Sequence, residues 1–324
     1  MGSGGISQQG GIMREDLSVG GDHVSVPGGW FGASRTLIVA AMLAVLAPTA
    51  PVRAQDLFNL FGRRDPLAAT SSDDARRDAV QAIPFEHIDR EDRAKLTRVL
   101  RAPTFYRRMP IRVIDCDPDL YLFMLRNPDV IVNIWKVLGL SELEMRRDEN
   151  GTFVINEPTG TRGTARFVYR GAETHVLYAE GTYRGPVFNR EILGRCVVVL
   201  RTGYVREPNQ RYYISTRMDS FVQIDDMPTE LLTKTLHPVL TKTAENNFEQ
   251  TLLFAGSLSR TAEVNHRGVQ RLASRLEWVD PTRRTRLAEL AASVAQKPSS
   301  LPQTGSNQPP EPAKPAVRLT GHAD

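Results

Sequence analysis

The stretch RCVVVLRTGYVREPNQRYYISTRMDSFVQI, residues 195–224, decides the fold class of this chain. Its two halves, 195–205 and 211–224, are rich in β-branched and aromatic residues, which favour extended strands. The turn sequence Glu207-Pro208-Asn209 separates the halves, and no segment of helical length lies between them. We therefore predict a hairpin of two long antiparallel strands.

Shorter strand patterns upstream extend this hairpin into a sheet. The clearest turn signal among them is Asn150-Gly151, because Asn-Gly supplies the positive φ angles that a tight hairpin requires. Residues 111–116 (IRVIDC) alternate apolar and polar side chains, which is the period of a half-buried strand. The pattern predicts an antiparallel sheet of about seven strands, of which the remaining members are 143–147, 152–156, 166–170 and 174–183.

Helical patterns flank the first of these strands. Residues 89–101 carry apolar residues at helical spacing behind an acidic first turn, and they predict a short amphipathic helix. Asp117 is a good N-cap and Pro118 suits the first helical position, so a second helix should begin there. A third helix over 129–138 should end at Gly139.

The period changes again after the sheet. Residues 228–261 carry large apolar residues at helical spacing and predict one long helix, which Pro238 should bend. A final helical pair over 266–294 should be divided at Asp280-Pro281. The chain is therefore expected to be α+β, with a long helix following an antiparallel sheet.

The N-terminal region predicts export. Residues 37–47 (LIVAAMLAVLA) form an uncharged apolar run of signal-peptide length, and Val52-Arg53-Ala54 places small residues where a signal peptidase reads them. The run is too short to cross a bilayer, which takes about 20 apolar residues, although an uncleaved anchor is the alternative. We predict a signal peptide over 1–54, a periplasmic or secreted protein, and no stable membrane span after cleavage.

Composition divides the rest of the chain. Residues 55–84 mix Arg, Asp and Ser without a clear apolar period and are interpreted as a linker. Residues 85–296 form the expected domain with its flanking helices. Residues 297–324 are rich in Pro, Ser and Gln, with too few apolar groups to offset the entropy of ordering, and predict a disordered tail. A weak protein partner, if there is one, would bind through this tail.

The order of elements resembles a known superfamily. One strand, two short helices, six antiparallel strands and a long helix resemble the helix-grip fold of the START-like (SRPBCC, polyketide cyclase-like) superfamily, over about residues 105–262. The segment CDPDLYLFMLRNPDVIVNIWKVLG (116–139) looks like the start of such domains in exported bacterial proteins of unknown role. The resemblance implies a curved sheet around the long C-terminal helix, with a ligand cavity between them and extra flanking helices.

Three functions remain open on this basis. The first is a non-enzymatic binding protein for a hydrophobic small molecule or lipid. The second is a cyclase- or isomerase-like enzyme of the same superfamily, which would use a polar cavity residue. The third is a protein-interaction module in which side chains fill the core between sheet and helix. The first is favoured, because export and the resemblance agree with it and no catalytic motif is present.

Candidate ligand-binding residues follow from the helix-grip arrangement. Glu245, Asn246 and Asn247 interrupt the apolar stripe of the long helix, and one that faced inward would be a polar anchor, although solvent exposure is the favoured interpretation. His237 lies on the same helix and is more simply a surface histidine or a hydrogen-bonded core histidine than an acid or base. The full candidate set is Trp135, Tyr178, His237, Glu245, Asn246, Asn247 and Phe248.

Other chemistries have little support in the sequence. The histidines are not spaced as metal ligands, so neither a metal nor a cofactor is expected. There is no glycine-rich phosphate loop, serine elbow or metalloprotease helix. A net charge of +4 with a pI of about 9.2 is too mild, and too evenly mixed with acidic residues, to indicate nucleic-acid binding.

The two cysteines are expected to be unpaired and buried. In the helix-grip arrangement Cys116 ends the first strand, Cys196 lies on the sixth, and the seventh lies between them. Two strand spacings are about 9.5 Å, beyond the limit of about 7 Å between the Cα atoms of a disulfide. A disulfide across the sheet is the minority alternative.

Export gives the first testable prediction. The mature protein, recovered from the periplasm or medium of its host, should begin at Gln55, because Ala54 ends the peptidase site. Intact mass and N-terminal sequencing measure this directly. A full-length chain that stays with the membrane fraction would support the uncleaved anchor instead.

Overall fold

The protein is described by a computed structural model over residues 67–184, 191–208, 210–225 and 237–297. The predicted signal peptide, most of the linker and nearly all of the tail lie outside these residues. The helices are α2 (Asp73–Gln81), the short 3-10 helix η2 (Phe85–His87), α3 (Arg90–Arg101), α4 (Pro118–Arg126), α5 (Pro128–Val137), α7 (His237–Ser274) and α8 (Pro281–Gln296). The strands are β1 (Phe105–Arg108), β2 (Arg112–Asp115), β3 (Glu144–Arg147), β4 (Phe153–Asn156), β5 (Thr161–Arg170), β6 (Thr174–Tyr183), β7 (Ile192–Arg206) and β8 (Tyr212–Ile224).

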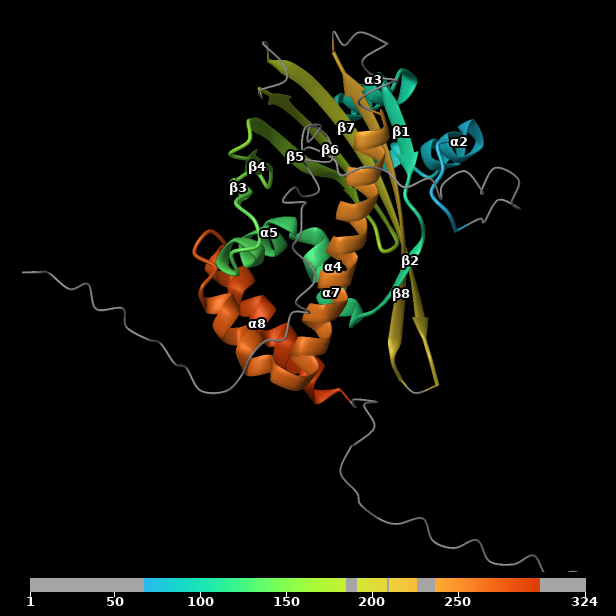
Figure 1. The fold of residues 1–324 in the computed structure, drawn as a ribbon. Coiled ribbons are helices and arrows are strands. Elements are labelled where there is room, and N and C mark those ends of the chain that lie inside the picture. The colour runs from blue at the N-terminus through green and yellow to red at the C-terminus, as the bar shows by residue number, and fades with distance from the viewer. Residues whose placement is uncertain (1–66, 185–190, 209, 226–236, 298–324) are drawn as a thin grey trace, which may run out of the picture.

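The eight strands form one antiparallel sheet, as the sequence predicted in its coarse form (Figure 1). Its order is β1-β8-β7-β6-β5-β4-β3, and β2 pairs with β8 beyond the end of β1. The quoted hairpin is β7 and β8, which pair without a register shift from Gly194 with Ile224 to Arg206 with Tyr212. The strand order follows the chain from β3 to β8, so each of these strands pairs with its neighbour in sequence.

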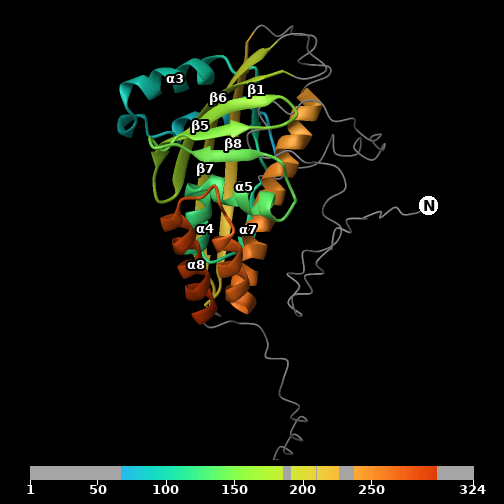
Figure 2. The same cartoon turned by 90° about the vertical axis from the view of Figure 1, so that its left-hand side faces the viewer.

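Helices cover both faces of this sheet. We call the face toward α7 the inner face and the face toward α2 and α3 the outer face. Figure 2 shows the sheet between α3 on one side and α7 on the other. The larger apolar core lies on the inner face, where α4, α5, α7 and α8 meet the strands. A smaller core lies on the outer face beneath α2 and α3.

Local sequence explains where the short helices begin. The Asp117 carboxylate accepts hydrogen bonds from the backbone N–H groups of Asp119 and Leu120, each at 3.1 Å, and Pro118 occupies the first turn of α4. Asp89 caps α3 in the same way, at 2.8 Å from the Asp92 nitrogen. Gly139 adopts φ +69°, as expected where α5 ends. These boundaries were predicted and are confirmed.

Part of the region interpreted as a linker is helical. Helix α2 begins at Ser72, whose hydroxyl accepts from the Ala75 nitrogen at 3.3 Å. Its buried residues are Ala75 and Ala79. Because alanines four apart carry little hydrophobic signal, the sequence pattern did not indicate a buried helix face here.

The sheet also has one more strand than the seven expected. Strand β1 pairs with the C-terminal part of β8, from Phe105 with Val222 to Arg108 with Asp219. Pro110 follows and has no N–H to donate to a ladder, so the edge of β8 is covered by two short strands, β1 and β2, in place of one.

The long helix continues further along the chain than its pattern predicted. Helix α7 starts at His237, and residues 228–236 lie outside the described chain, so the bend expected at Pro238 is not tested. Its irregular point is Asn265, with φ −146° and ψ 57°. The Asn265 side chain accepts from the Gly268 nitrogen at 2.9 Å and so caps the second half of the helix. The break between the predicted long helix and helical pair is therefore this kink.

A buried carboxylate fastens the outer layer to the sheet. Asp219 on β8 is fully buried and lies 2.7 Å from Arg108 Nε. The Tyr106 hydroxyl donates to it at 2.8 Å, and Arg201 NH2 lies at 3.3 Å. Both arginines also bind Asp78 of α2, and these contacts hold the pKa of Asp78 down at about 2. The network joins α2 to β1, β7 and β8.

Removing this carboxylate should destabilise the fold. Asp219→Ala leaves Arg108 and Arg201 without their buried counter-charge, so the free energy of unfolding should fall by about 3–5 kcal/mol. Urea denaturation measures the change. The matched control is Asp74→Ala, which removes an exposed ion pair with Arg77 and should cost less than about 1 kcal/mol. Equal effects of the two substitutions would contradict a structural role for the network.

Candidate functional site

The structure brings some of the predicted site residues together and separates others. Trp135 and Phe248 are buried in the inner core, 5% and 4% exposed. Tyr178 belongs to the outer core, and its hydroxyl donates to Glu180 at 2.9 Å, so it lies on the opposite face from α7. Asn246 is exposed to solvent. The His237 side chain lies outside the described residues.

Asn247 differs from the exposure that was favoured for it. It is only 5% exposed, and its Nδ2 atom is buried without a hydrogen-bond partner. It follows Ala244 by three positions and adjoins Phe248, both of which are buried in the inner core, so it lies at the border of the buried stripe of α7. The structure thus places one polar residue of this segment inward, next to apolar neighbours.

Glu245 is engaged in an ion pair at the opposite border of the same stripe. Its Oε1 atom lies 2.7 Å from Arg107 Nε and 2.5 Å from Arg107 NH2. Arg107 is on β1 and is the register partner of Ser220. The pair links α7 to β1 in the cross-strand row that contains Ser220, and Asn247 lies two residues further along α7.

The inner face is incompletely covered at this level. Leu177 and Leu200 lie on central strands of the sheet, and both are only partly buried although they pack against the inner core. On the outer face the neighbouring Val176, Val197 and Val199 are 0% exposed. Because both sets come from the middle of the same strands, the difference reflects what covers each face. The inner face therefore keeps some accessible apolar surface at Leu177 and Leu200.

Small side chains occupy part of the inner face of the sheet. Ala165, Ala179 and Cys196 form one cross-strand row of the inner face. Gly163 and Gly181 are partners in the adjoining row, and a Cβ on either would come within 2.6 or 2.5 Å of a carbonyl oxygen of the other strand. Only glycine permits this close approach of β5 and β6, and neither residue fills space above the sheet.

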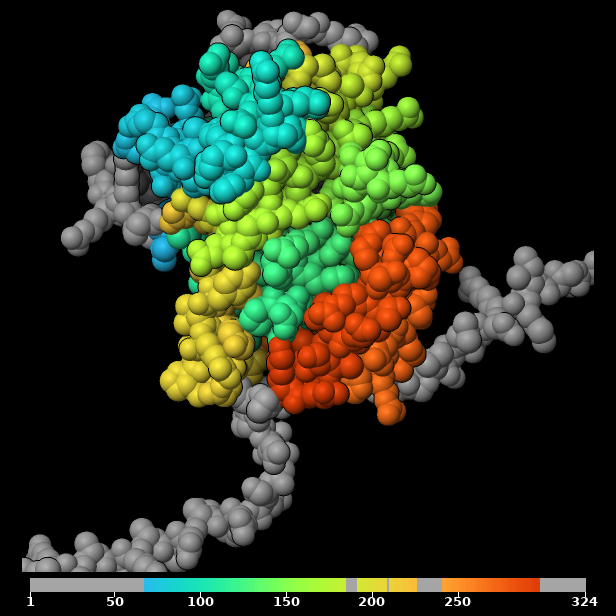
Figure 3. Space-filling view, turned by 180° about the vertical axis from the view of Figure 1, so that it is seen from behind, coloured from blue at the N-terminus to red at the C-terminus, as the bar shows by residue number. Residues whose placement is uncertain are grey.

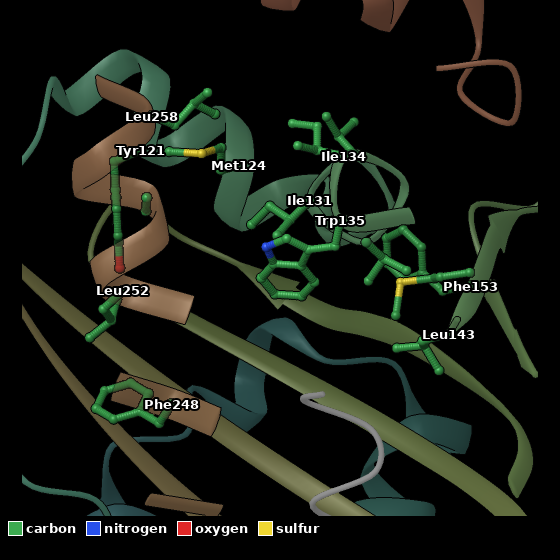
Figure 4. Packing of buried hydrophobic residues seen from close by; sticks show 14 of the residues in the cluster. Tyr121, Met124, Ile131, Ile134, Trp135, Leu143, Phe153, Phe248, Leu252 and Leu258 are labelled. Atoms are coloured by element: carbon green, nitrogen blue, oxygen red, sulfur yellow. The ribbon is translucent and has the colours of Figure 1, made fainter. Parts of the chain in front are cut away.

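An aromatic pair lies where α5 meets α7. The rings of Trp135 and Phe254 have centroids 5.4 Å apart and meet edge to face at 66°. Figure 4 shows Phe248 and Leu252 on α7 and Trp135 on α5, all projecting over the strands. Beyond this pair the core is packed solidly by α4, α5 and α8 against α7.

Both cysteines are free and buried, as predicted. β8 lies between β2, which precedes Cys116, and β7, which carries Cys196. Burial raises the pKa of the Cys196 thiol to about 12, and burial also raises the pKa of the Cys116 thiol. Thiols held in this protonated form are poor nucleophiles.

A pocket lies on the outer face of the sheet. A pocket of about 300 Å³ opens beside α2, with Arg201 and Arg217 among its lining residues. The two arginines are Cα partners across β7 and β8, and Glu173 lines the same pocket. In Figure 3 the upper part of this face is covered by α2 and α3, and the lower strands are left open.

Among the described residues, no group of three or more His, Cys, Asp or Glu side chains is arranged to hold a metal ion. No helix within the same part of the chain is long and apolar enough to cross a bilayer.

Among the histidines whose burial the structure describes, His175 is the one that is completely buried. It lies at the start of β6, and Arg126 Nε donates to its Nε2 at 3.4 Å. Its Nδ1 atom is buried without a partner. Burial, with the positive charges of Arg126 and Arg170, lowers its pKa from 6.5 to about 4. This environment could not be predicted from the residues around His175, because the contacts come from α4 and β5.

This lowered pKa predicts a pH dependence of stability. Between pH 6.5 and 4 the unfolded chain binds a proton at His175 that the folded chain does not, so stability is full above pH 6.5 and falls as pH falls toward 4. His175→Gln should make the loss of unfolding free energy over this range smaller by about 3 kcal/mol. Urea denaturation of both proteins from pH 4 to 7 tests this, and parallel pH profiles would contradict it.

Comparison with known proteins assigns no family to this chain. No family model matches it, and no curated protein does. A hypothetical protein of Helicobacter pylori of known structure is 10% identical, with 45% of this chain and 84% of that chain covered and a TM-score of 0.30. An uncharacterised protein of Rhizobium leguminosarum is 11% identical, with 45% and 96% covered and a TM-score of 0.25. The candidate site therefore rests on the geometry of this chain alone.

Proposed function

We propose that this protein has the helix-grip arrangement and binds a hydrophobic small molecule or lipid between the inner face of the sheet and α7. The observation that carries the proposal is the incomplete burial of Leu177 and Leu200 at the centre of an otherwise well-packed sheet. Apolar surface left accessible inside a fold favours an apolar ligand, because its burial removes that surface from water.

Asn247 gives the proposed space a polar anchor. An unsatisfied buried donor costs a fold about 1–3 kcal/mol, so its presence on the buried border of α7 is explained if a ligand accepts its hydrogen bond. Ligand sites commonly combine apolar walls with a few polar groups that fix orientation. Trp135 and Phe254 would then form the apolar end of the site.

Catalysis has less support than binding. An enzyme of this superfamily would need an inward titratable group that exchanges protons near neutral pH. Glu245 is held by Arg107, and the pKa of His175, lowered to about 4, leaves that side chain neutral and weakly basic. His175 therefore lacks the proton exchange near pH 7 that a general acid or base needs.

The proposed site of action is outside the cytoplasm. The apolar run 37–47 and the small residues at 52 and 54 support export. A binding protein for an insoluble molecule in that compartment would act as its carrier or sensor, with no membrane span of its own after cleavage.

Filling the space should abolish binding without unfolding the protein. The mature chain is titrated with N-phenyl-1-naphthylamine, an uncharged fluorophore whose emission rises in apolar sites. Leu177→Trp should weaken its binding at least tenfold, because the indole occupies the proposed space. Val154→Trp is the matched control, since Val154 is 47% exposed on β4, and it should leave binding unchanged.

Thermal unfolding of the same variants separates binding from a filled core. If the space is open, Leu177→Trp should keep the melting temperature within a few degrees of the parent. If side chains fill it, overpacking should destabilise the fold by about 1–3 kcal/mol, and the parent should not bind the fluorophore. That pair of results would favour the protein-interaction module.

A further inference from the structure

Three arginines gather at one edge of the inner face without a carboxylate of their own. Arg126 ends α4, Arg147 ends β3 and Arg170 ends β5. In the described part of the chain, no aspartate or glutamate forms an ion pair with any of the three. Arg283, a half-buried arginine nearby, does have such a partner, in Asp129.

Aromatic and neutral groups hold the three guanidinium groups in place. Arg147 lies over the Phe153 ring, 5.6 Å from its centroid, and Arg170 lies over the Phe167 ring at 4.8 Å. The two rings are 6.1 Å apart, centroid to centroid. The rings meet edge to face at 80°, and each guanidinium group lies over one of them, which holds the arginine side chain without neutralising its charge.

Arg126 is held beside the other two arginines by hydrogen bonds to β6 and to the turn that precedes it. Its NH2 atom donates to the Gly171 carbonyl oxygen at 3.1 Å, and its Nε donates to His175 at 3.4 Å. His175 is the register partner of Arg170 and lies 6.0 Å from the Phe167 ring, centroid to centroid. In Figure 3 the α4–α5 segment borders the strands β5 and β6 on one surface of the molecule.

The positive charges of the three arginines affect the pKa of Arg170. The pKa of Arg170 is lowered by burial and then by the positive charges of Arg147 and Arg126. The charge of Arg147 acts on the buried carboxylate of Asp129, but that carboxylate is already paired with Arg283. One neutral acceptor, the Asn127 side-chain oxygen, lies 3.4 Å from Arg147 NH1. The cluster therefore keeps an excess of positive charge.

We propose that Arg126, Arg147 and Arg170 form a binding site for a phosphoryl group. Guanidinium groups match the oxygens of a tetrahedral oxyanion, and several of them around one anion offset the cost of gathering like charges. Arg170 is exposed and Arg126 and Arg147 are half-buried, so the site is open to solvent. The phosphoryl group belongs either to a free phosphate or to a phospholipid headgroup at the rim of the protein.

Phosphate titration tests the site on the mature chain. Sodium phosphate should raise the melting temperature more than sodium chloride at matched ionic strength, because it binds the folded state alone. Isothermal titration calorimetry gives the affinity. Arg170→Gln should weaken phosphate binding about tenfold and should itself raise the melting temperature, because it removes a like charge. Arg162→Gln, an exposed arginine on the same strand, is the matched control and should change neither.

Vesicle binding identifies the source of the phosphoryl group. Vesicles of phosphatidylglycerol and of phosphatidylcholine are compared by co-sedimentation, with Arg170→Gln alongside. Retention by phosphatidylglycerol that is lost in the variant supports a lipid headgroup, and phosphate binding without vesicle binding supports a free phosphate. The proposal is overturned if phosphate acts no more strongly than chloride and the vesicles bind parent and variant equally. Because these ligands contact only the arginine edge, the outcome is independent of N-phenyl-1-naphthylamine binding.

Discussion

The pairing of β7 with β8 is the constraint on which the rest of the structure depends. The two strands stay in register from one end of the sheet to the other, and side chains alternate strictly between its faces. Each residue of the hairpin is thereby committed to one core. Asp219 goes to the outer face with its two arginines, and Ser220 goes to the inner face at the level of α7. A slip of one residue would exchange the two sets.

The two faces are built differently as a result. On the outer face, fully buried valines and Phe221 meet α2 and α3, and the ion pairs of Asp219 with Arg108 and Arg201 reach Asp78 of α2. On the inner face, the row of Ala165, Ala179 and Cys196 presents small side chains, and α7 is held at the sheet edge by Glu245 and Arg107. The outer layer is thus tied together by ion pairs, while the inner face keeps accessible apolar surface at Leu177 and Leu200.

Local signals were read correctly from the sequence and non-local ones were not. The cap of α4 at Asp117 and the end of α5 at Gly139 depend on adjacent residues, so they could be predicted. Strand β1 was missed because it pairs with β8, more than a hundred positions away in the chain. The face of Tyr178 depends on the register of β5 with β6 and β7, which alternation alone does not supply. Asn247 was expected outside because its burial depends on the rotation of α7 against the sheet.

The arginine edge and His175 were also beyond sequence reasoning. Their contacts join α4, β3, β5 and β6, and no spacing in the chain brings those elements together. The coarse fold, an antiparallel sheet followed by a long helix, was predicted because each strand from β3 to β8 pairs with its sequence neighbour. How tightly sheet and helix pack together is decided by side-chain volume, and a pattern of apolar residues does not measure volume.

Native mass spectrometry, with organic extraction, of the mature protein purified from its own host tests the central claim most directly. The account predicts a co-purifying adduct of lipid mass that is released by extraction and identified in the organic phase. A clean mass of the polypeptide alone, from gently handled protein with nothing in the extract, would contradict a ligand space between the inner face and α7.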